Sequence, residues 1–156
     1  MKIQLTQNHL KIIKNHAQKT YPEECCGLIL GHINNNIKKV IEIIPTENVW
    51  NTEAQTFTTE THSKNRRYAI APQVMLQTQK FARDRNLNII GIFHSHPNYP
   101  ATPSEWDRIY AWPEYSYMIV TVENSKAGEI NSFSLDENHQ FQPEIIESIE
   151  EYRDNI

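Results

Sequence analysis

One segment, residues 89–107, constrains this 156-residue chain more than any other. It opens with the apolar run Ile89-Ile-Gly-Ile-Phe93, whose length and β-branched side chains are typical of a strand buried on both faces. His94 and His96 stand at the end of this run. Because strand side chains alternate between two faces, the His-x-His spacing directs both imidazoles to one side, where a single metal ion can bind both. The segment therefore predicts a metal site.

A short helix is expected after the proline-rich turn that follows. Thr102 is the expected N-cap, Pro103 the first helical residue and Glu105 the partner that closes a capping box. Ser104 and Asp107 are three residues apart, so they would share a helix face that can point at the histidines. Two histidines and Asp107 give three ligands and leave one tetrahedral position open, as in catalytic zinc sites. A simpler interpretation stays open, because Ser104-x-x-Asp107 is also a capping-box pattern.

These residues resemble the signature of the JAMM (MPN+) family of zinc metallopeptidases. The matching pattern is His94-Ser-His96, then ten residues that begin with Pro97, then Asp107, with Ser104 three residues before Asp107. The resemblance covers residues 6–141 and is closest to short bacterial members that consist of this domain alone. It implies Zn²⁺ as the cofactor, with His94, His96 and Asp107 as its ligands.

Members of this family also carry a glutamate near the N-terminus. Residues 21–31 resemble the segment that supplies it, and the Glu-x-Cys-Gly register selects Glu24 rather than Glu23. Glu24 lies at the start of an apolar strand, where a carboxylate is costly unless it has a partner or a role. An exposed glutamate at a strand start is the alternative for this residue.

The chemistry implied is hydrolysis of an amide bond. Zinc would lower the pKa of its water toward ~7 and polarise the scissile carbonyl. Glu24 would take the proton from that water and pass it to the departing amine, and Ser104 would donate its hydroxyl to the oxyanion. In the family the cleaved bond follows the C-terminal Gly-Gly of ubiquitin or a ubiquitin-like protein. A short bacterial member suggests a ubiquitin-like sulfur-carrier protein as substrate.

Three alternatives remain. RadC-like proteins share the histidine and Ser-x-x-Asp spacing, but they typically have His-Asn-His-Pro followed by Ser-Gly, where this chain has His-Ser-His-Pro-Asn-Tyr. A peptidoglycan or small-amide hydrolase is a second alternative, because one fold can host several amidase substrates. A non-catalytic MPN scaffold is the third, although a pure binding module has no need for an open metal position.

The order of the expected elements predicts an α/β (α+β) fold with a central mixed β-sheet flanked by helices. The resemblance adds that it is an MPN-type, cytidine-deaminase-like domain. We expect residues 1–156 to form one domain, with a core over 6–146 and a tail over 147–156. The expected helices span 6–20 and 72–86, and the second should turn Val74, Met75, Phe81 and Ala82 toward the core. The expected strands span 25–33, 37–45, 68–71 and 115–122, with a closing hairpin of 131–135 and 140–146. Residues 144–152 fit either a strand or a helix.

Residues 46–67 form an unusually long polar connection, with a possible strand near 56–61. Long connections in compact domains are often functional or mobile. The segment resembles the variable insertion that helps members of the family to hold substrate. An ordinary surface loop is the alternative.

Composition excludes several classes of protein. The net charge is −4 and no Lys/Arg cluster is long enough to neutralise a row of phosphates, which argues against nucleic-acid binding. No apolar stretch reaches the ~18 residues of a membrane span, and the N-terminus lacks the apolar core of a signal peptide. We therefore expect a cytoplasmic protein without a membrane partner. The oligomeric state is left open, a homodimer included.

The only two cysteines, Cys25 and Cys26, are adjacent in sequence. Their Cα atoms are then about 3.8 Å apart, below the usual disulfide range of about 4.4–6.8 Å, so no structural disulfide is expected. Cys26 precedes an apolar run and is interpreted as a small buried residue rather than as a nucleophile.

Overall fold

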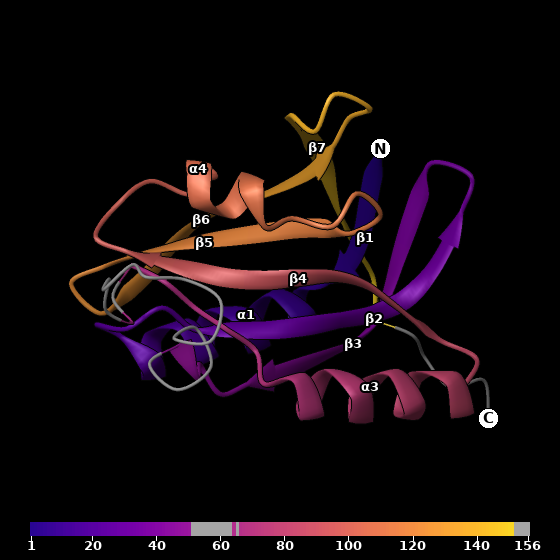
Figure 1. Cartoon of the computed structure of the whole chain (residues 1–156), viewed down its shortest axis with the longest axis horizontal. Coiled ribbons are helices and arrows are strands. Elements are labelled where there is room, and N and C mark those ends of the chain that lie inside the picture. Colours follow the sequence, from indigo (N-terminus) through magenta and orange to yellow (C-terminus); the bar gives the residue numbers. More distant parts are fainter. Residues whose placement is uncertain (51–63, 65, 152–156) are drawn as a thin grey trace.

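The structure, a computed structural model, describes residues 1–50, 64 and 66–151 of the chain (Figure 1). Its elements are, in order, β1 (Lys2–Thr6), α1 (Gln7–Thr20), β2 (Cys26–Asn34), β3 (Ile37–Thr46), α3 (Pro72–Asp84), β4 (Asn88–Pro97), α4 (Glu105–Ile109), β5 (Ser116–Glu123), β6 (Lys126–Leu135) and β7 (Phe141–Ile149). The mixed α/β class and most expected elements are therefore confirmed.

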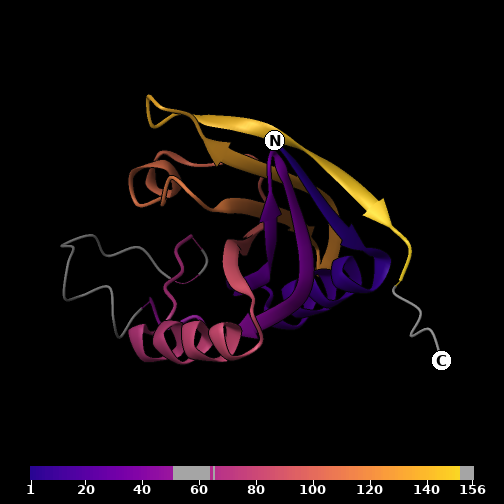
Figure 2. The same ribbon diagram turned by 90° about the vertical axis from the view of Figure 1, so that its right-hand side faces the viewer.

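The strands form one mixed sheet that closes into a barrel in the order β1-β3-β2-β4-β5-β6-β7, with β7 paired to β1. The pairs β1–β3, β1–β7 and β4–β5 are parallel, and the other pairs are antiparallel. Figure 2 shows β6 and β7 arching over the rest of the molecule. The sheet is thus a closed barrel, and the narrower expectation of a cytidine-deaminase-like sheet remains a prediction.

Two helices cover opposite faces of the central strands. Helix α1 contacts β1, β3, β4, β5 and β6, so the curved sheet wraps around it, and its Ile13 and Ala17 belong to the main core cluster. Helix α3 lies on the other face, where Ala82 packs with Leu30 and Leu87 (Figure 1). Strand β4 therefore runs between two packed layers, as its apolar run predicts.

Strand β4 approaches its parallel neighbour β5 very closely at Gly91. A Cβ atom at this position would lie 2.4 Å from the carbonyl oxygen of Ser116, a distance that real contacts do not allow. Glycine is therefore required here by the close approach of two backbones. This packing fixes the position of β4 and of the two histidines at its end.

Several boundaries differ from the expectations. Residues 68–71 do not form a strand, although the Ala69 carbonyl accepts a hydrogen bond from the Val49 N–H, at 2.9 Å. Helix α3 ends at Asp84, and its Phe81 is not in the core, because the side chain is 36% exposed and lies under the guanidinium of Arg85. Strand β1 was not expected at all.

The C-terminal alternative is settled in favour of a strand. Residues Phe141–Ile149 form β7, which pairs with both β6 and β1 and so closes the barrel. Long-range pairing with the N-terminal strand has overridden the helical periodicity of this segment. The possible strand near 56–61 lies outside the described residues, and the substrate-holding role of 46–67 stays a prediction.

Both cysteines are free and buried, which confirms the expected burial of Cys26. Within the described part of the chain, no helix combines the length and apolar character needed to cross a bilayer.

Candidate metal centre

The register of β2 and β4 brings the expected glutamate to the histidines. Cys26 pairs with His94 in this antiparallel ladder, so the chain two residues before Cys26 runs beside His96. The pairing continues beyond the strand end, because the Cys25 N–H donates to the Ser95 Oγ at 2.7 Å. Glu24, His94 and His96 consequently form a buried group that could hold a metal ion.

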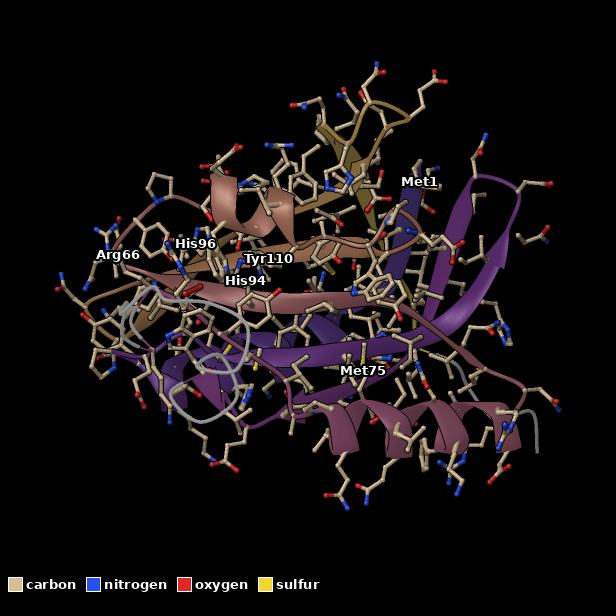
Figure 3. All side chains as sticks on the ribbon, viewed as in Figure 1. Met1, Arg66, Met75, His94, His96 and Tyr110 are labelled. Atoms are coloured by element: carbon tan, nitrogen blue, oxygen red, sulfur yellow. The ribbon has the colours of Figure 1, made fainter. Side chains whose placement is uncertain are left out.

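His94 and His96 point to the same side of β4, as their spacing predicts. Their Nε2 atoms are 3.1 Å apart, and Figure 3 shows both side chains gathered near one end of the strand. Each ring is stacked on a tyrosine, His94 on Tyr68 with ring centres 4.6 Å apart and His96 on Tyr99 at 4.0 Å. The stacking restricts the rotation of both imidazoles, so the two nitrogens are held facing one another.

A hydrogen bond assigns the tautomer of His96. Its Nδ1 lies 2.7 Å from the Pro100 carbonyl oxygen, which can only accept, so Nδ1 carries the proton and Nε2 keeps a lone pair for a ligand. Burial lowers the pKa of His96 below its ordinary value, although Asp107 opposes that shift. A neutral imidazole is the form that binds metal ions.

Helix α4 supplies Asp107, but it begins later than expected. Its N-cap is Ser104 rather than Thr102, and Pro103 precedes the helix instead of opening it. The Ser104 Oγ accepts from the Asp107 N–H at 3.1 Å, and the Asp107 Oδ2 accepts from the Ser104 N–H at 2.8 Å. The expected capping box of Thr102 and Glu105 is therefore wrong, because Ser104 and Asp107 form the box themselves.

The same Asp107 oxygen faces both histidines. Oδ2 lies 3.3 Å from the His94 Nε2 and 3.4 Å from the His96 Nε2. Burial alone would raise the pKa of this carboxyl, but the two histidines and the Ser104 N–H outweigh it and hold the pKa well below its ordinary value. Asp107 is therefore an ionised carboxylate directed at two imidazole nitrogens.

The pKa of Glu24 is shifted in the opposite direction to that of Asp107. Burial, and then the nearby charge of Asp107, raise its pKa well above 4.5, while a hydrogen bond from Tyr99 and the charges of Arg67 and Arg66 oppose this shift. Its Oε2 is buried and has no hydrogen-bond partner among the described residues. A buried carboxylate oxygen without a partner is costly, so its presence beside the histidines indicates a functional group.

Asn48 holds the Glu24 backbone in place, and sequence analysis missed it. Its Nδ2 donates to the carbonyl oxygens of Glu24 and Arg67, both at 3.0 Å. Its Oδ1 accepts from the N–H groups of Trp50 and Ala69, at 3.0 and 3.1 Å. One buried amide thus joins three segments around the site. A lone asparagine in a polar connection carries no sequence signal for this role.

The three inward-facing atoms fit zinc. Ligands placed ~2.0–2.1 Å from a tetrahedral zinc ion are about 3.3 Å from one another. The two Nε2 atoms and the Asp107 Oδ2 are separated by 3.1, 3.3 and 3.4 Å. Glu24 lies beside them, in a group with both histidines whose ligand atoms are all within 4.8 Å of one another. The structure thus brings together all five residues that the sequence singles out, with Ser104 joined to Asp107.

Known proteins share this architecture. A protein from Desulfitobacterium hafniense has a TM-score of 0.79 and 26% identity, over 99% of this chain and 97% of that one. A Salinibacter ruber protein has a TM-score of 0.68 and 26% identity, over 96% and 92% of the two chains. A JAB1/MPN domain protein from Archaeoglobus fulgidus, 17% identical, matches with a TM-score of 0.53 over 95% of this chain and all (100%) of that one. No curated protein matches significantly.

The fold and the site together define a JAB/MPN-type domain. The model of the family described as prokaryotic homologs of the JAB domain matches residues 6–136. The chain belongs to this family, and the resemblance to the MPN family is confirmed.

Proposed function

We propose that this protein is a zinc-dependent peptidase or isopeptidase of the JAMM type. The observation that carries the proposal is the tetrahedral spacing of three buried ligand atoms, from His94, His96 and Asp107. The Glu24 carboxylate lies beside them, and its buried Oε2 has no hydrogen-bond partner among the described residues. When bound there, zinc would lower the pKa of a coordinated water toward ~7 and polarise the scissile carbonyl.

His94, His96 and Asp107 act as the ligands in this proposal. Their separations support the assignment, because the Asp107 Oδ2 lies 3.3 and 3.4 Å from the two histidine nitrogens, close to the 3.1 Å between those nitrogens. The hydrogen bond from the Ser104 N–H to the Asp107 Oδ2 and the bond between His96 and Pro100 keep two of the ligands oriented.

Glu24 acts as the general base and then as the general acid. Burial, which raises the pKa of this carboxyl well above its ordinary value, makes it a stronger base than an exposed glutamate, so it can accept a proton from water and then release it to the departing amine. The Tyr99 hydroxyl, which is hydrogen-bonded to the carboxylate, orients it without supplying a competing positive charge.

Ser104 acts as the oxyanion donor. Its oxygen already accepts the Asp107 N–H, so the hydroxyl hydrogen is available to the substrate. The capping role and the catalytic role are therefore compatible in one residue. Preorganised donors of this kind are worth roughly 10²–10³-fold in turnover.

The proposed substrate is a ubiquitin-like or sulfur-carrier protein with residues attached after its C-terminal Gly-Gly. This choice rests on the resemblance to the JAMM family. A cytoplasmic location remains a prediction alongside it, and the oligomeric state, a homodimer included, stays open.

The test is to incubate the zinc-loaded protein with ubiquitin-like sulfur carriers that carry extra residues after Gly-Gly, and to follow release by mass spectrometry. The expected result is a product that ends in Gly-Gly, formed by the wild type and not by Asp107→Ala. Cleavage of peptidoglycan fragments or small amides instead would favour the alternative hydrolases. Binding of the carriers without cleavage by the zinc-loaded protein would favour a non-catalytic scaffold.

A further inference from the structure

A cavity of about 370 Å³ adjoins the metal centre. Asp107 forms part of its wall, and the His94 ring is stacked on Tyr68, another of its wall residues. All three tryptophans of the chain, Trp50, Trp106 and Trp112, line it. A concentration of aromatic side chains around one cavity next to a candidate active site is the expected form of a substrate pocket.

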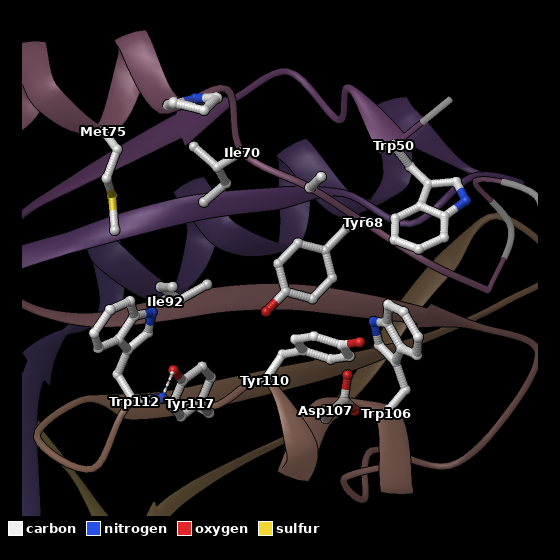
Figure 4. Close-up of a pocket in the computed structure, with 12 residues that line it drawn as sticks. Trp50, Tyr68, Ile70, Met75, Ile92, Trp106, Asp107, Tyr110, Trp112 and Tyr117 are labelled. Atoms are coloured by element: carbon white, nitrogen blue, oxygen red, sulfur yellow. Dashed lines mark hydrogen bonds between the residues drawn. The ribbon is translucent and has the colours of Figure 1, made fainter. Parts of the chain in front are cut away.

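The cavity has a polar end and an apolar end (Figure 4). Asp107 and Trp106 stand together at one end, and Met75, Ile92 and Trp112 lie at the other, with Tyr68 projecting between them. The backbone N–H of Trp112 donates to the Tyr117 hydroxyl at 2.6 Å, which satisfies one of the few polar groups at the apolar end. A side chain that enters beside Asp107 would therefore reach a surface suited to rings and alkyl groups.

The aromatic wall continues to the molecular surface. Trp112 is 63% exposed and Tyr110 is 49% exposed, and both also line the cavity. Exposed large aromatic side chains of this kind are favoured at binding surfaces, because they bury much area for little loss of conformational entropy. The same cavity is therefore lined by exposed aromatic side chains and by Asp107, so a substrate chain can reach the metal centre from the surface.

We propose that this cavity is a specificity pocket that takes one large aromatic or apolar side chain of the substrate, close in sequence to the amide bond that is cleaved. The identification of the bond rests on the proposed function. A volume of about 370 Å³, at the lower end of the ~300–1,000 Å³ typical of small-molecule sites, has room for one large side chain of the substrate.

Binding is tested first, without any metal or cleavage. N-acetyl-phenylalanine amide is titrated into the protein, and the three indole N–H signals are followed by ¹H–¹⁵N NMR. We expect saturable shifts of the Trp106 and Trp112 signals, identified with tryptophan-to-phenylalanine variants, and at least about tenfold weaker binding of N-acetyl-alanine amide. No shift with the phenylalanine amide, or equal shifts with both compounds, would overturn the pocket.

Two variants locate the binding. Met75→Trp fills the apolar end and should weaken binding of the phenylalanine amide by about tenfold or more. Leu76→Ala is the matched control, since Leu76 follows Met75 on α3, is 59% exposed and does not line the cavity. An equal effect of both substitutions would place the binding elsewhere and contradict the proposal.

Cleavage is then tested separately with zinc-loaded protein and two series of capped peptides. One series varies the residue after Gly-Gly, and the other varies the residue before it. A preference for phenylalanine over alanine in kcat/KM, in either series, supports the pocket. Cleavage without any such preference would refute the pocket and leave the proposed function standing. Selective binding in the NMR titration without cleavage of any peptide would support the pocket and contradict the proposed peptidase function.

Discussion

Ser104 and Asp107 cap each other across the first turn of α4, each accepting a hydrogen bond from the other's backbone N–H. The oxygen of Asp107 that takes part in this exchange is also the one that faces His94 and His96. A capping box and a metal ligand are therefore not competing interpretations of Asp107. The hydrogen bond from the Ser104 N–H at the start of the helix orients the Asp107 carboxylate toward the two histidines.

Ser104→Ala should lower both turnover and stability. The lost N-cap should cost about 1 kcal/mol of unfolding free energy. The lost oxyanion donor should slow turnover by roughly 10²-fold while zinc stays bound. A thermal melt beside a rate assay separates the two effects. Ser104→Thr, which keeps the hydroxyl and the cap, is the matched control, and normal turnover in Ser104→Ala would show that the serine only caps the helix.

Glu24→Gln should keep zinc and the fold but lose turnover by roughly 10²–10⁴-fold, because the amide cannot accept the proton from water. Steady-state kinetics on the released peptide measure the loss. Glu23→Gln is the control, since Glu23 precedes the buried site residue and is only half-buried. An equal loss in Glu23→Gln, or full activity in Glu24→Gln, would mean that the wrong carboxylate has been assigned.

The raised pKa of Glu24 predicts a pH dependence of stability in metal-free protein. Burial favours the protonated form, so the folded state holds this proton to higher pH than the unfolded state does. The contribution to stability is full below about pH 4.5 and is lost as pH rises through the folded-state pKa. Because glutamine carries no titratable proton, the unfolding free energy of Glu24→Gln should not show this fall with pH, and at neutral pH the variant should be more stable than the wild type in a denaturant titration. Parallel curves for the two proteins would contradict the prediction.

A second buried charge lies away from the site. Lys38 on β3 is 1% exposed, and its Nζ donates to the Ser116 Oγ at 2.8 Å and lies 3.9 Å from Glu144 Oε2. The other oxygen of Glu144 accepts from the Ser132 hydroxyl at 2.8 Å. These contacts join four strands, β3, β5, β6 and β7, inside the barrel.

Lys38→Met should therefore destabilise the protein by about 3–5 kcal/mol, because it leaves the Glu144 carboxylate buried without a positive partner. Lys38→Met combined with Glu144→Gln should recover part of the loss, since both charges are then absent. Chemical denaturation measures both variants. Lys126→Met, at an exposed lysine, is the control and should change stability by less than about 0.5 kcal/mol. A double variant no more stable than Lys38→Met would rule out the charge-pair explanation.

The local patterns around the site were readable from the sequence. Alternation of side chains in β4 predicted that His94 and His96 face the same way, and the apolar run predicted a strand buried on both faces. The start of α4 was misplaced, because Thr102 and Ser104 carry similar capping signals and only the tertiary position of Asp107 decides between them. The chemical roles of Glu24 and Ser104 remain predictions.

Features that depend on contacts between distant parts of the chain could not be predicted from local sequence patterns. The strand character of residues 141–149 comes from pairing with β1 at the other end of the chain, against a local pattern that also fits a helix. Asn48 is recognisable only through its four partners, which come from separate segments. Phe81 looks like a core residue by spacing, yet its ring lies at the surface under Arg85.

The proposed function requires that His94, His96 and Asp107 bind one zinc ion. Zinc K-edge X-ray absorption on protein loaded with one equivalent of zinc reports the ligands themselves. We expect tightly bound zinc with nitrogen and oxygen ligands only, at ~2.0–2.2 Å, two of them imidazoles, and no bound zinc in His96→Ala or Asp107→Ala. Absence of bound zinc in the wild type after careful loading, or a sulfur ligand at ~2.3 Å from the neighbouring cysteines, would contradict it.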